Sequence, residues 1–429
     1  MKILAGLAMT LLLHGIEPVS SDLYRPLYHE AAPYPVTRPL YATAQPWRLD
    51  SMEYARHFRI AEIGSFADIE GKNLEGFDKK IAYEWLAGFY RDQTAYDPFA
   101  RWAYLNKEKA TLNPHYTPNG NDFYYDLCSE EVRNKRVEYL IRRTKVLGLD
   151  GLFFDWANEE FLKEPPFAPL QKELSRRHPG TTYAKCIAKF LKALRDRGLL
   201  LVTNQAYRNP ELLEFVDYDM SESYIMTNTT LPKKAIIDQK HQPIPVTQLV
   251  PLDEVLHYFD HLRKLKRFYR IFGFKNFIYM NYAAPKLLPM PTGYRTAQPR
   301  EAIFYVYALT KMAGFVPFTE VPYDHALERT KLYFADLGEP IGKMQRKNGF
   351  LYRLFENGFI LVAHNLSTTN YFRLHNLPKG CYYDLFDEVW LQNNGSMVIR
   401  LDPFYDPWTK RFYPAAKVFV HEDTLPHQR

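Results

Sequence analysis

The stretch Gly148-Leu-Asp-Gly-Leu-Phe-Phe-Asp-Trp156 decides the fold predicted for this chain. Its apolar residues 151–154 run directly into an acid, and such a run is typical of a strand buried on both faces of a parallel sheet. The preceding residues predict a helix that Ser129 caps and Gly148 ends. The side chains that would face the sheet recur at helical spacing: Val137, Leu140, Ile141, Thr144 and Leu147. A helix, a turn, a buried strand and Asp155 at its C-terminal end form the order found in α/β active sites.

Short apolar runs recur along the chain, with helical patterns between several of them. The eight predicted strands lie at 60–63, 81–86, 122–126, 151–154, 199–203, 218–221, 277–280 and 314–318. The clearest helical patterns lie at 183–197, 252–272 and 300–312. Eight alternating units predict a (β/α)8 TIM barrel. The competing open, doubly wound sheet would need a glycine-rich turn after its first strand, where residues 63–66 supply one glycine.

Composition changes on both sides of the predicted barrel, which we place at residues 51–340. Residues 22–50 are rich in Pro and Tyr, and they predict an extended strap rather than a packed element. Beyond residue 338, strand-like runs at 349–355, 358–363, 381–385 and 396–401 are separated by turn residues. They predict a small C-terminal antiparallel β-sandwich over residues 345–425.

The N-terminus resembles a secretory signal at residues 1–21, with an apolar run from Ile3 to Leu13 that is too short to span a bilayer comfortably. We therefore expect export to the periplasm or the exterior, without an integral membrane span. The three cysteines are odd in number and widely spaced, which argues against a disulfide framework. Cys186 falls in a helical pattern, where it is expected to be a small buried apolar residue.

The charge and the aromatic content of the chain bear on which class of partner it binds. The formal charge of +6 is spread along the chain without a long Lys/Arg block, so nucleic-acid binding gains no support. Aromatic residues make up 16% of the chain, which suits both dense cores and grooves that stack on sugar rings. Dense cores account for most of this aromatic content, and a carbohydrate polymer is expected as partner on the strength of the candidate site residues.

Chemistry in a barrel of this type lies at the C-terminal ends of the strands. There the sequence places Asp155 and Glu222, two carboxylates that can converge on one substrate atom, as glycosidic bond hydrolysis requires. The residues expected to bind and position the substrate are Trp156, Asn204, Tyr207, Tyr224, Tyr282 and Glu320. A single acid at a strand end is more often a cap or the partner of an arginine, and Glu62, Glu84 and Asp126 are weaker candidates.

The segment Gly148–Asp155 resembles the "G-[FL]-D-G-[VL]-F-x-D" strand of barrel glycoside hydrolases, above all the polygalactosaminidase-like family. Asn204-Gln205 and Asp219-Met-Ser-Glu222 are similar to the next two strands of that family. The resemblance implies a TIM-barrel glycosidase with Asp155 and Glu222 as its catalytic carboxylates, and it does not fix the sugar. Trp156 and residues 159–177 have no counterpart in the family pattern.

The sequence therefore predicts an exported glycoside hydrolase that uses two carboxylates and needs no cofactor or metal. Two alternatives stay open: an inactive glycan-binding barrel and a metal-dependent carbohydrate esterase. His257 and His261 form a possible metal pair at i, i+4, although they lack the Glu of a His-Glu-x-x-His site and fall within a predicted outer helix. The sequence contains no Gly-x-Ser-x-Gly elbow, phosphate loop or Cys-x-x-Cys motif.

Overall fold

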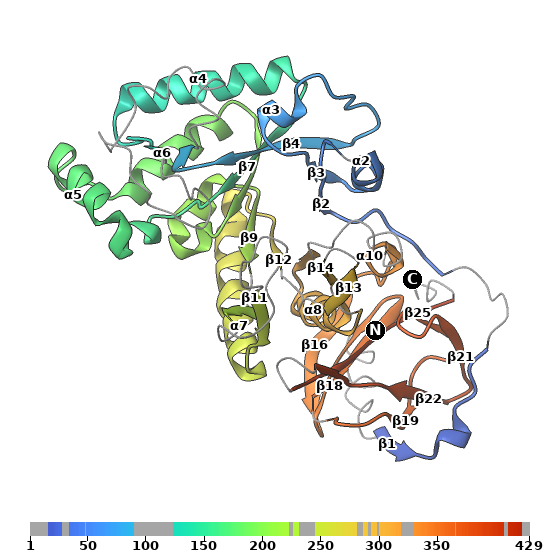
Figure 1. The fold of residues 1–429 in the computed structure, drawn as a ribbon. Helices are drawn as coiled ribbons and strands as arrows, with labels where there is room; N and C mark the ends of the chain where they lie inside the picture. The colour runs from blue at the N-terminus through green and yellow to red at the C-terminus, as the bar shows by residue number, and fades with distance from the viewer. Residues whose placement is uncertain are drawn as a thin grey trace. The chain divides into compact units, whose positions relative to one another are not determined.

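The computed structural model describes residues 16–27, 34–47, 49–89, 123–222, 226–230, 245–280, 286–290, 293–297, 300–318, 330–364, 366–406 and 411–422. The chain divides into two compact units (Figure 1). One unit comprises residues 40–222 and 256–279, and the other comprises residues 1–39, 223–255 and 280–429.

Eight strands form one sheet whose spatial order follows the order of the chain. They are β2 (Tyr41–Thr43), β3 (Ile60–Glu62), β4 (Lys79–Trp85), β7 (Gly151–Asp155), β8 (Leu200–Asn204), β9 (Tyr218–Glu222), β12 (Asn276–Met280) and β15 (Val316–Phe318). Neighbouring strands from β2 to β9 run parallel. Parallel strands in chain order, alternating with helices, make the fold a (β/α)8 barrel, as predicted.

Helices connect most of these strands. They are α2 (Leu49–Ala55), α3 (Phe66–Ile69), α4 (Glu130–Val146), α5 (Ala168–Arg177), α6 (Tyr183–Arg195), α7 (Leu252–Tyr269), α8 (Arg300–Ala313) and α10 (Thr330–Phe334). The predicted ends of α4 are confirmed: the Ser129 side chain accepts a hydrogen bond from the Val132 N–H, and Gly148 adopts a φ of 64°.

The central strand β7 is buried on both faces, as its apolar sequence predicts. Phe154 packs against Phe190 of α6, with ring centroids 5.5 Å apart, whereas the alternate Phe153 stacks on Tyr83 of β4 at 5.7 Å. Gly151 is required where β7 meets β8, because a Cβ there would lie 1.9 Å from the Leu200 carbonyl oxygen. Alternation along β7 therefore points Asp155 to the same face as Phe153.

Two predicted assignments are wrong. Residues 122–126 do not supply a barrel strand, since β6 (Phe123–Tyr124) pairs antiparallel with β5 (Gly88–Phe89) in a separate two-stranded sheet. The missing first strand is β2, inside residues 22–50, where Tyr41 and Ala42 are each 2% exposed. Strand β2 has three residues, which is too short for a periodic pattern to be detected. The proline-rich residues around it predicted an extended strap instead.

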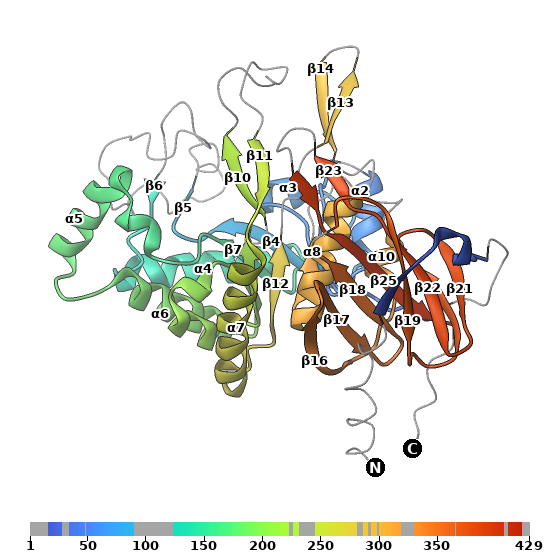
Figure 2. The same ribbon diagram turned by 90° about the horizontal axis from the view of Figure 1, so that it is seen from below.

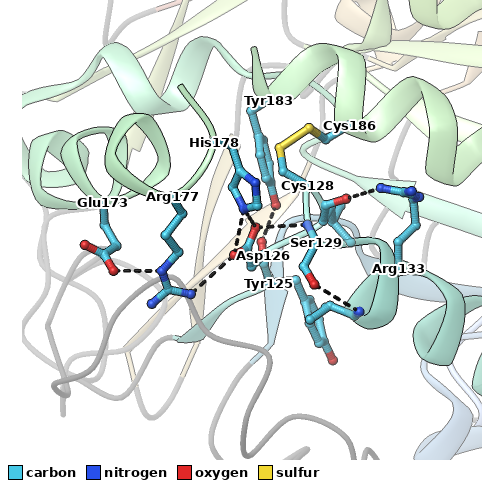
Figure 3. Close-up of polar contacts among 12 residues, drawn as sticks. Tyr125, Asp126, Cys128, Ser129, Arg133, Glu173, Arg177, His178, Tyr183 and Cys186 are labelled. Carbon is cyan, nitrogen blue, oxygen red and sulfur yellow. Dashed lines mark hydrogen bonds and ion pairs between the residues drawn. A yellow bond between two sulfur atoms is a disulfide. The ribbon is translucent and has the colours of Figure 1, made fainter. Parts of the chain in front are cut away.

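The cysteine prediction is also wrong, because Cys128 and Cys186 form a disulfide that links the start of α4 to α6 (Figure 3). Cys186 is buried as expected, but it is not a free thiol. The two cysteines are separated by 58 residues, so sequence spacing gave no sign that the fold brings them together. Cys381 remains free.

The C-terminal part is the predicted antiparallel β-sandwich (Figure 2). One sheet has the order β16 (Pro340–Lys347), β17 (Phe350–Phe355), β18 (Gly358–Ala363), β25 (Ala415–His421), β20 (Gly380–Asp384) and β21 (Val389–Asn393). The other has the order β1 (Ile16–Val19), β19 (Asn370–His375) and β22 (Ser396–Leu401). Apolar side chains of both sheets form one core, including Phe359 and Phe419 of the first and Phe372 and Ile399 of the second.

Four two-stranded ribbons complete the described strands. Besides β5–β6 they are β10 (Met226–Thr230) with β11 (Pro245–Leu249), β13 (Lys286–Met290) with β14 (Gly293–Ala297), and β23 (Phe404–Asp406) with β24 (Arg411–Tyr413). Among the described helices, none combines the length and the apolar character that crossing a membrane requires.

Strand β1 lies inside the predicted leader. It pairs antiparallel with β19, and cleavage near Ser21 would remove it from the edge of the three-stranded sheet. Most of the leader, residues 1–15, lies outside the described residues. The signal peptide therefore stays a prediction.

Candidate active site

Four strands of the sheet end on an acid or an amide, and two tyrosines lie further back along neighbouring strands. The strand-end residues are Glu62, Asp155, Asn204 and Glu222, and the tyrosines are Tyr41 of β2 and Tyr83 of β4. Hydrogen bonds join these residues: Tyr41 donates to Glu62, Tyr83 donates to Asp155, and Asn204 donates to both Asp155 and Glu222. Parallel strands bring these groups together because their C-terminal ends meet at one edge of the sheet.

Asn204 bridges the two predicted catalytic acids. Its Nδ2 donates to Asp155 Oδ1 at 2.9 Å and to Glu222 Oε2 at 2.8 Å. The two carboxylate oxygens therefore lie no more than 5.7 Å apart, the sum of those distances. Asn204 is 3% exposed, so its amide is held rigidly between the acids. The pair predicted from the sequence thus converges on one point.

Asp155 accepts three hydrogen bonds. Oδ1 accepts from Asn204 Nδ2 and from the Trp156 N–H at 2.9 Å, and Oδ2 accepts from the Tyr83 hydroxyl at 2.7 Å. Burial raises the pKa of Asp155, the donors from Tyr83 and Asn204 oppose that rise, and Glu222 adds to it. Because both donors to Oδ1 can only donate, a proton on Asp155 could reside only on Oδ2. Oδ1 of Asp155 therefore acts only as a hydrogen-bond acceptor in this environment.

Backbone strain marks the same two strand ends. Trp156 and Gln205, which directly follow Asp155 and Asn204, adopt φ angles of 53° and 66°. Non-glycine residues in this left-handed region carry a cost of roughly 1–3 kcal/mol each, and such residues cluster at functional sites. The strained turn at Trp156 also points the Trp156 N–H at Asp155 Oδ1, which accepts a hydrogen bond from it.

A third carboxylate, Glu62, ends β3 beside the pair. It is 9% exposed and accepts a hydrogen bond from the Tyr41 hydroxyl. Burial, followed by the charge of Glu62, raises the pKa of Tyr41 well above its ordinary value, so that the phenol stays protonated as a donor. Glu62 was a weaker candidate from the sequence, and the structure places it on the same face as Asp155.

The other weaker acids serve the surrounding structure. Glu84 faces the buried Arg136 of α4 at 3.5 Å, and the guanidinium lies over the Tyr125 ring. Asp126 accepts from His178 at 2.8 Å and from Arg177 at 3.3 Å, beside the disulfide (Figure 3). These contacts fix α4 and α5 around the barrel and leave neither acid for chemistry.

Asp219 lies on the opposite face of β9 and supports the loop after β8. It accepts from the Thr203 hydroxyl at 2.7 Å and from the N–H groups of Ala206 and Tyr207, each at 2.9 Å. Complete burial raises its pKa to about 7. This carboxyl holds the strained segment that begins at Gln205.

The predicted substrate-binding residues are placed unevenly. The Trp156 ring packs near Trp85, Phe161 and Phe167, with centroids 5.9–6.2 Å apart. The Tyr207 ring packs against Tyr258 and Phe277 of the same unit, with centroids 5.8 and 6.5 Å away. Tyr224, Tyr282 and Glu320 lie outside the described residues.

Tyr83 is the residue that the sequence reasoning missed. It lies two residues before the end of β4, so a scan of strand ends passes over it. Period-two alternation from Trp85, a residue at the strand end, would have placed Tyr83 on the inner face.

His257 and His261, the possible metal pair, are exposed on α7. No group of three or more His, Cys, Asp or Glu able to hold a metal occurs among the described residues.

Should Asp155 act as a catalytic carboxylate, replacing Tyr83 with Phe will shift the pH profile of the reaction. Its hydroxyl lowers the pKa of Asp155, so its loss raises that pKa further and moves the acidic limb of kcat/KM to higher pH. One hydrogen bond to a charged group is worth about 1.5–3 kcal/mol, or roughly one to two pH units. A pH–rate profile measures the shift. Tyr54→Phe, on α2, is the matched control, and an unmoved limb in Y83F would contradict this role.

No family model matches the sequence, and comparison with curated proteins finds no match. The chain is similar in structure to the glycoside hydrolase domain of PelA from Pseudomonas aeruginosa, at 19% identity and a TM-score of 0.40, covering 67% of this chain and 96% of that one. It is also similar to α-amylase from Geobacillus thermoleovorans (10% identity, TM-score 0.44, covering 90% and 99%). An α-amylase from Malbranchea cinnamomea gives 9% identity and a TM-score of 0.46, covering 91% and 97%.

Proposed function

We propose that this protein is a glycoside hydrolase that cleaves O-glycosidic bonds of a polysaccharide or oligosaccharide with Asp155 and Glu222. The observation that carries the proposal is the pair of carboxylates held on one amide, Asn204, at the C-terminal ends of β7 and β9. The segments that resemble the polygalactosaminidase-like family are the same two that supply these acids. Among the described residues, no arginine or lysine pairs with either acid, so neither is neutralised as a structural ion pair would be.

The separation of the acids favours retention of anomeric configuration. Retaining glycosidases hold their carboxyl groups about 5–5.5 Å apart, and inverting enzymes hold them about 6.5–9.5 Å apart to admit a water. The bridged oxygens of Asp155 and Glu222 are at most 5.7 Å apart, which leaves little room for a water between them.

The hydrogen bonds to Asp155 and Glu222 support different roles for the two acids. Asp155 accepts three hydrogen bonds that stabilise its charged form, which suits the nucleophile that attacks the anomeric carbon. Among the described residues, Glu222 accepts one hydrogen bond, from Asn204, and it would protonate the leaving oxygen and then activate the water that releases the sugar. Atoms balance across the two steps: the glycosidic bond is replaced by an ester to Asp155, and water then replaces that ester.

The proposal is tested by the release of product and by the anomeric configuration of that product. Incubation of the wild-type protein with acidic, neutral and amino-sugar polymers should release new reducing ends from at least one of them. NMR of the first product should show the anomeric configuration of the substrate. Reducing ends from none of the polymers would contradict hydrolysis, whereas an inverted first product would contradict the assigned nucleophile.

Export belongs to the same proposal. Disulfides persist mainly in oxidising compartments, and the link between Cys128 and Cys186 is one that such a compartment would maintain. The expected substrate, a carbohydrate polymer outside the cytoplasm, would be encountered there.

A further inference from the structure

The C-terminal end of α7 and the 3-10 helix η9 (Arg270–Phe272) that follows it expose large apolar side chains. Phe268 is 61% exposed, Ile271 is 78% exposed and Phe272 is 38% exposed. The rings of Phe268, Tyr269 and Phe272 contact one another, with centroids 4.9–6.3 Å apart. The outward face of a surface helix is ordinarily polar, so a cluster of this kind marks an interaction surface.

Basic residues surround this cluster. Residues 263–275 contain no acid and carry six cations: Arg263, Lys264, Lys266, Arg267, Arg270 and Lys275. Within α7, Lys264, Arg267 and Phe268 lie at i, i+3 and i+4, so charged and apolar groups share one face of the helix. The opposite face of α7 is buried through Val255, Tyr258, Phe259 and Leu262. Helix α7 lies beside β12 (Figure 2), and Phe259 packs against Tyr279 of that strand with ring centroids 5.1 Å apart.

Nearby acids neutralise part of this charge. Asp260 pairs with Arg263, and Asp217 pairs with Lys275 at 3.0 Å. Glu211 and Glu214 lie near Tyr269, where they add to the effect of burial in raising the pKa of its hydroxyl. Among the described residues, no acid forms an ion pair with Lys264, Arg267 or Arg270, so the outward face keeps a positive surplus.

We propose that this face docks the protein on an anionic phospholipid bilayer. The docking face consists of Lys264, Arg267, Phe268, Arg270, Ile271 and Phe272. Aromatic and aliphatic side chains of interfacial helices enter the boundary between headgroups and acyl chains, while Lys and Arg contact anionic headgroups. The docking face supplies both components, and the complementary charge selects an anionic surface. This inference is independent of the proposed hydrolysis, because none of its residues touches Asp155 or Glu222.

Sedimentation with lipid vesicles tests the proposal. The full chain should pellet with vesicles of equal parts phosphatidylglycerol and phosphatidylcholine, and it should stay in solution with phosphatidylcholine alone. Raising the ionic strength from about 0.01 M to about 1 M shortens the screening length from about 30 Å to about 3 Å, so partitioning should fall at least about tenfold. Failure of the wild-type protein to pellet with the anionic vesicles at low salt would overturn the proposal.

Two double variants separate the contributions. Lys264→Glu with Arg267→Glu should lower partitioning at least about 25-fold, since each cation near an anionic surface contributes about fivefold. Phe268→Ser with Ile271→Ser should lower it at least about tenfold by removing the inserted side chains. Lys172→Glu and Val146→Ser change exposed positions elsewhere in the same unit, and they should pellet like the wild type.

Variant results can also overturn the proposal. If both double variants pellet like the wild type while keeping its thermal unfolding, the docking face does not bind lipid. Self-association of the wild type that these variants abolish, without vesicle binding, would assign the face to a second copy of the chain instead.

Discussion

Replacing Asp155 with Asn should lower kcat/KM by at least about 10³-fold on every glycoside that the wild type cleaves, including those with activated leaving groups. The amide cannot attack the anomeric carbon, so loss of the nucleophile removes the first step whatever the leaving group. The fold should survive the change. The amide oxygen can accept from Asn204 and Trp156, while the amide nitrogen can donate to the Tyr83 hydroxyl oxygen.

Initial rates on a polymer and on an aryl glycoside, together with a thermal unfolding curve, measure this effect. Asp196→Asn is the matched control, because that aspartate is 59% exposed and pairs with Lys192 on the protein surface. D155N with wild-type turnover would refute the catalytic assignment. A collapse of the unfolding temperature would show instead that the carboxylate is structural.

Glu222→Gln should give the opposite dependence on the leaving group. We expect a loss of about 10²–10⁴-fold on natural glycosides, whose leaving oxygen must be protonated, and a much smaller loss on aryl glycosides with acidic leaving groups. Asn204 Nδ2 would still find the Gln oxygen as an acceptor, so the bridge can persist. Added azide, a nucleophile that needs no base, should restore turnover and yield a glycosyl azide.

The ratio of kcat/KM for the two substrate types provides the measurement. Glu131→Gln, 70% exposed on α4, controls for the change of charge. Equal losses on both substrates, without azide rescue, would contradict the role of acid and base. If D155N rather than E222Q showed selective loss and rescue, the two roles would be exchanged.

The sequence predicted most of the barrel because several inner strands are buried on both faces and carry apolar runs, as residues 151–154 and 199–202 do. Residues 151–154, 199–203 and 218–221 each coincide with an observed strand. For two segments, the local sequence pattern did not identify the barrel strand correctly. One strand was assigned at 122–126, where the chain forms a separate ribbon, and β2 was missed within a proline-rich segment. The two errors cancelled in the count of eight and left the order of the later strands unchanged.

The sequence by itself determined the chemistry on offer, namely acids at the ends of predicted strands, Asp155 and Glu222, and an amide at Asn204. Strand periodicity fixes which residues end a strand, and parallel order fixes that these ends share an edge. Only the tertiary structure decided that Asn204 holds the two acids within 5.7 Å, that Tyr83 reaches Asp155, and that Cys128 meets Cys186. Those contacts join residues 18 to 72 positions apart, and they depend on strand register and side-chain direction across the sheet, which a local pattern does not encode.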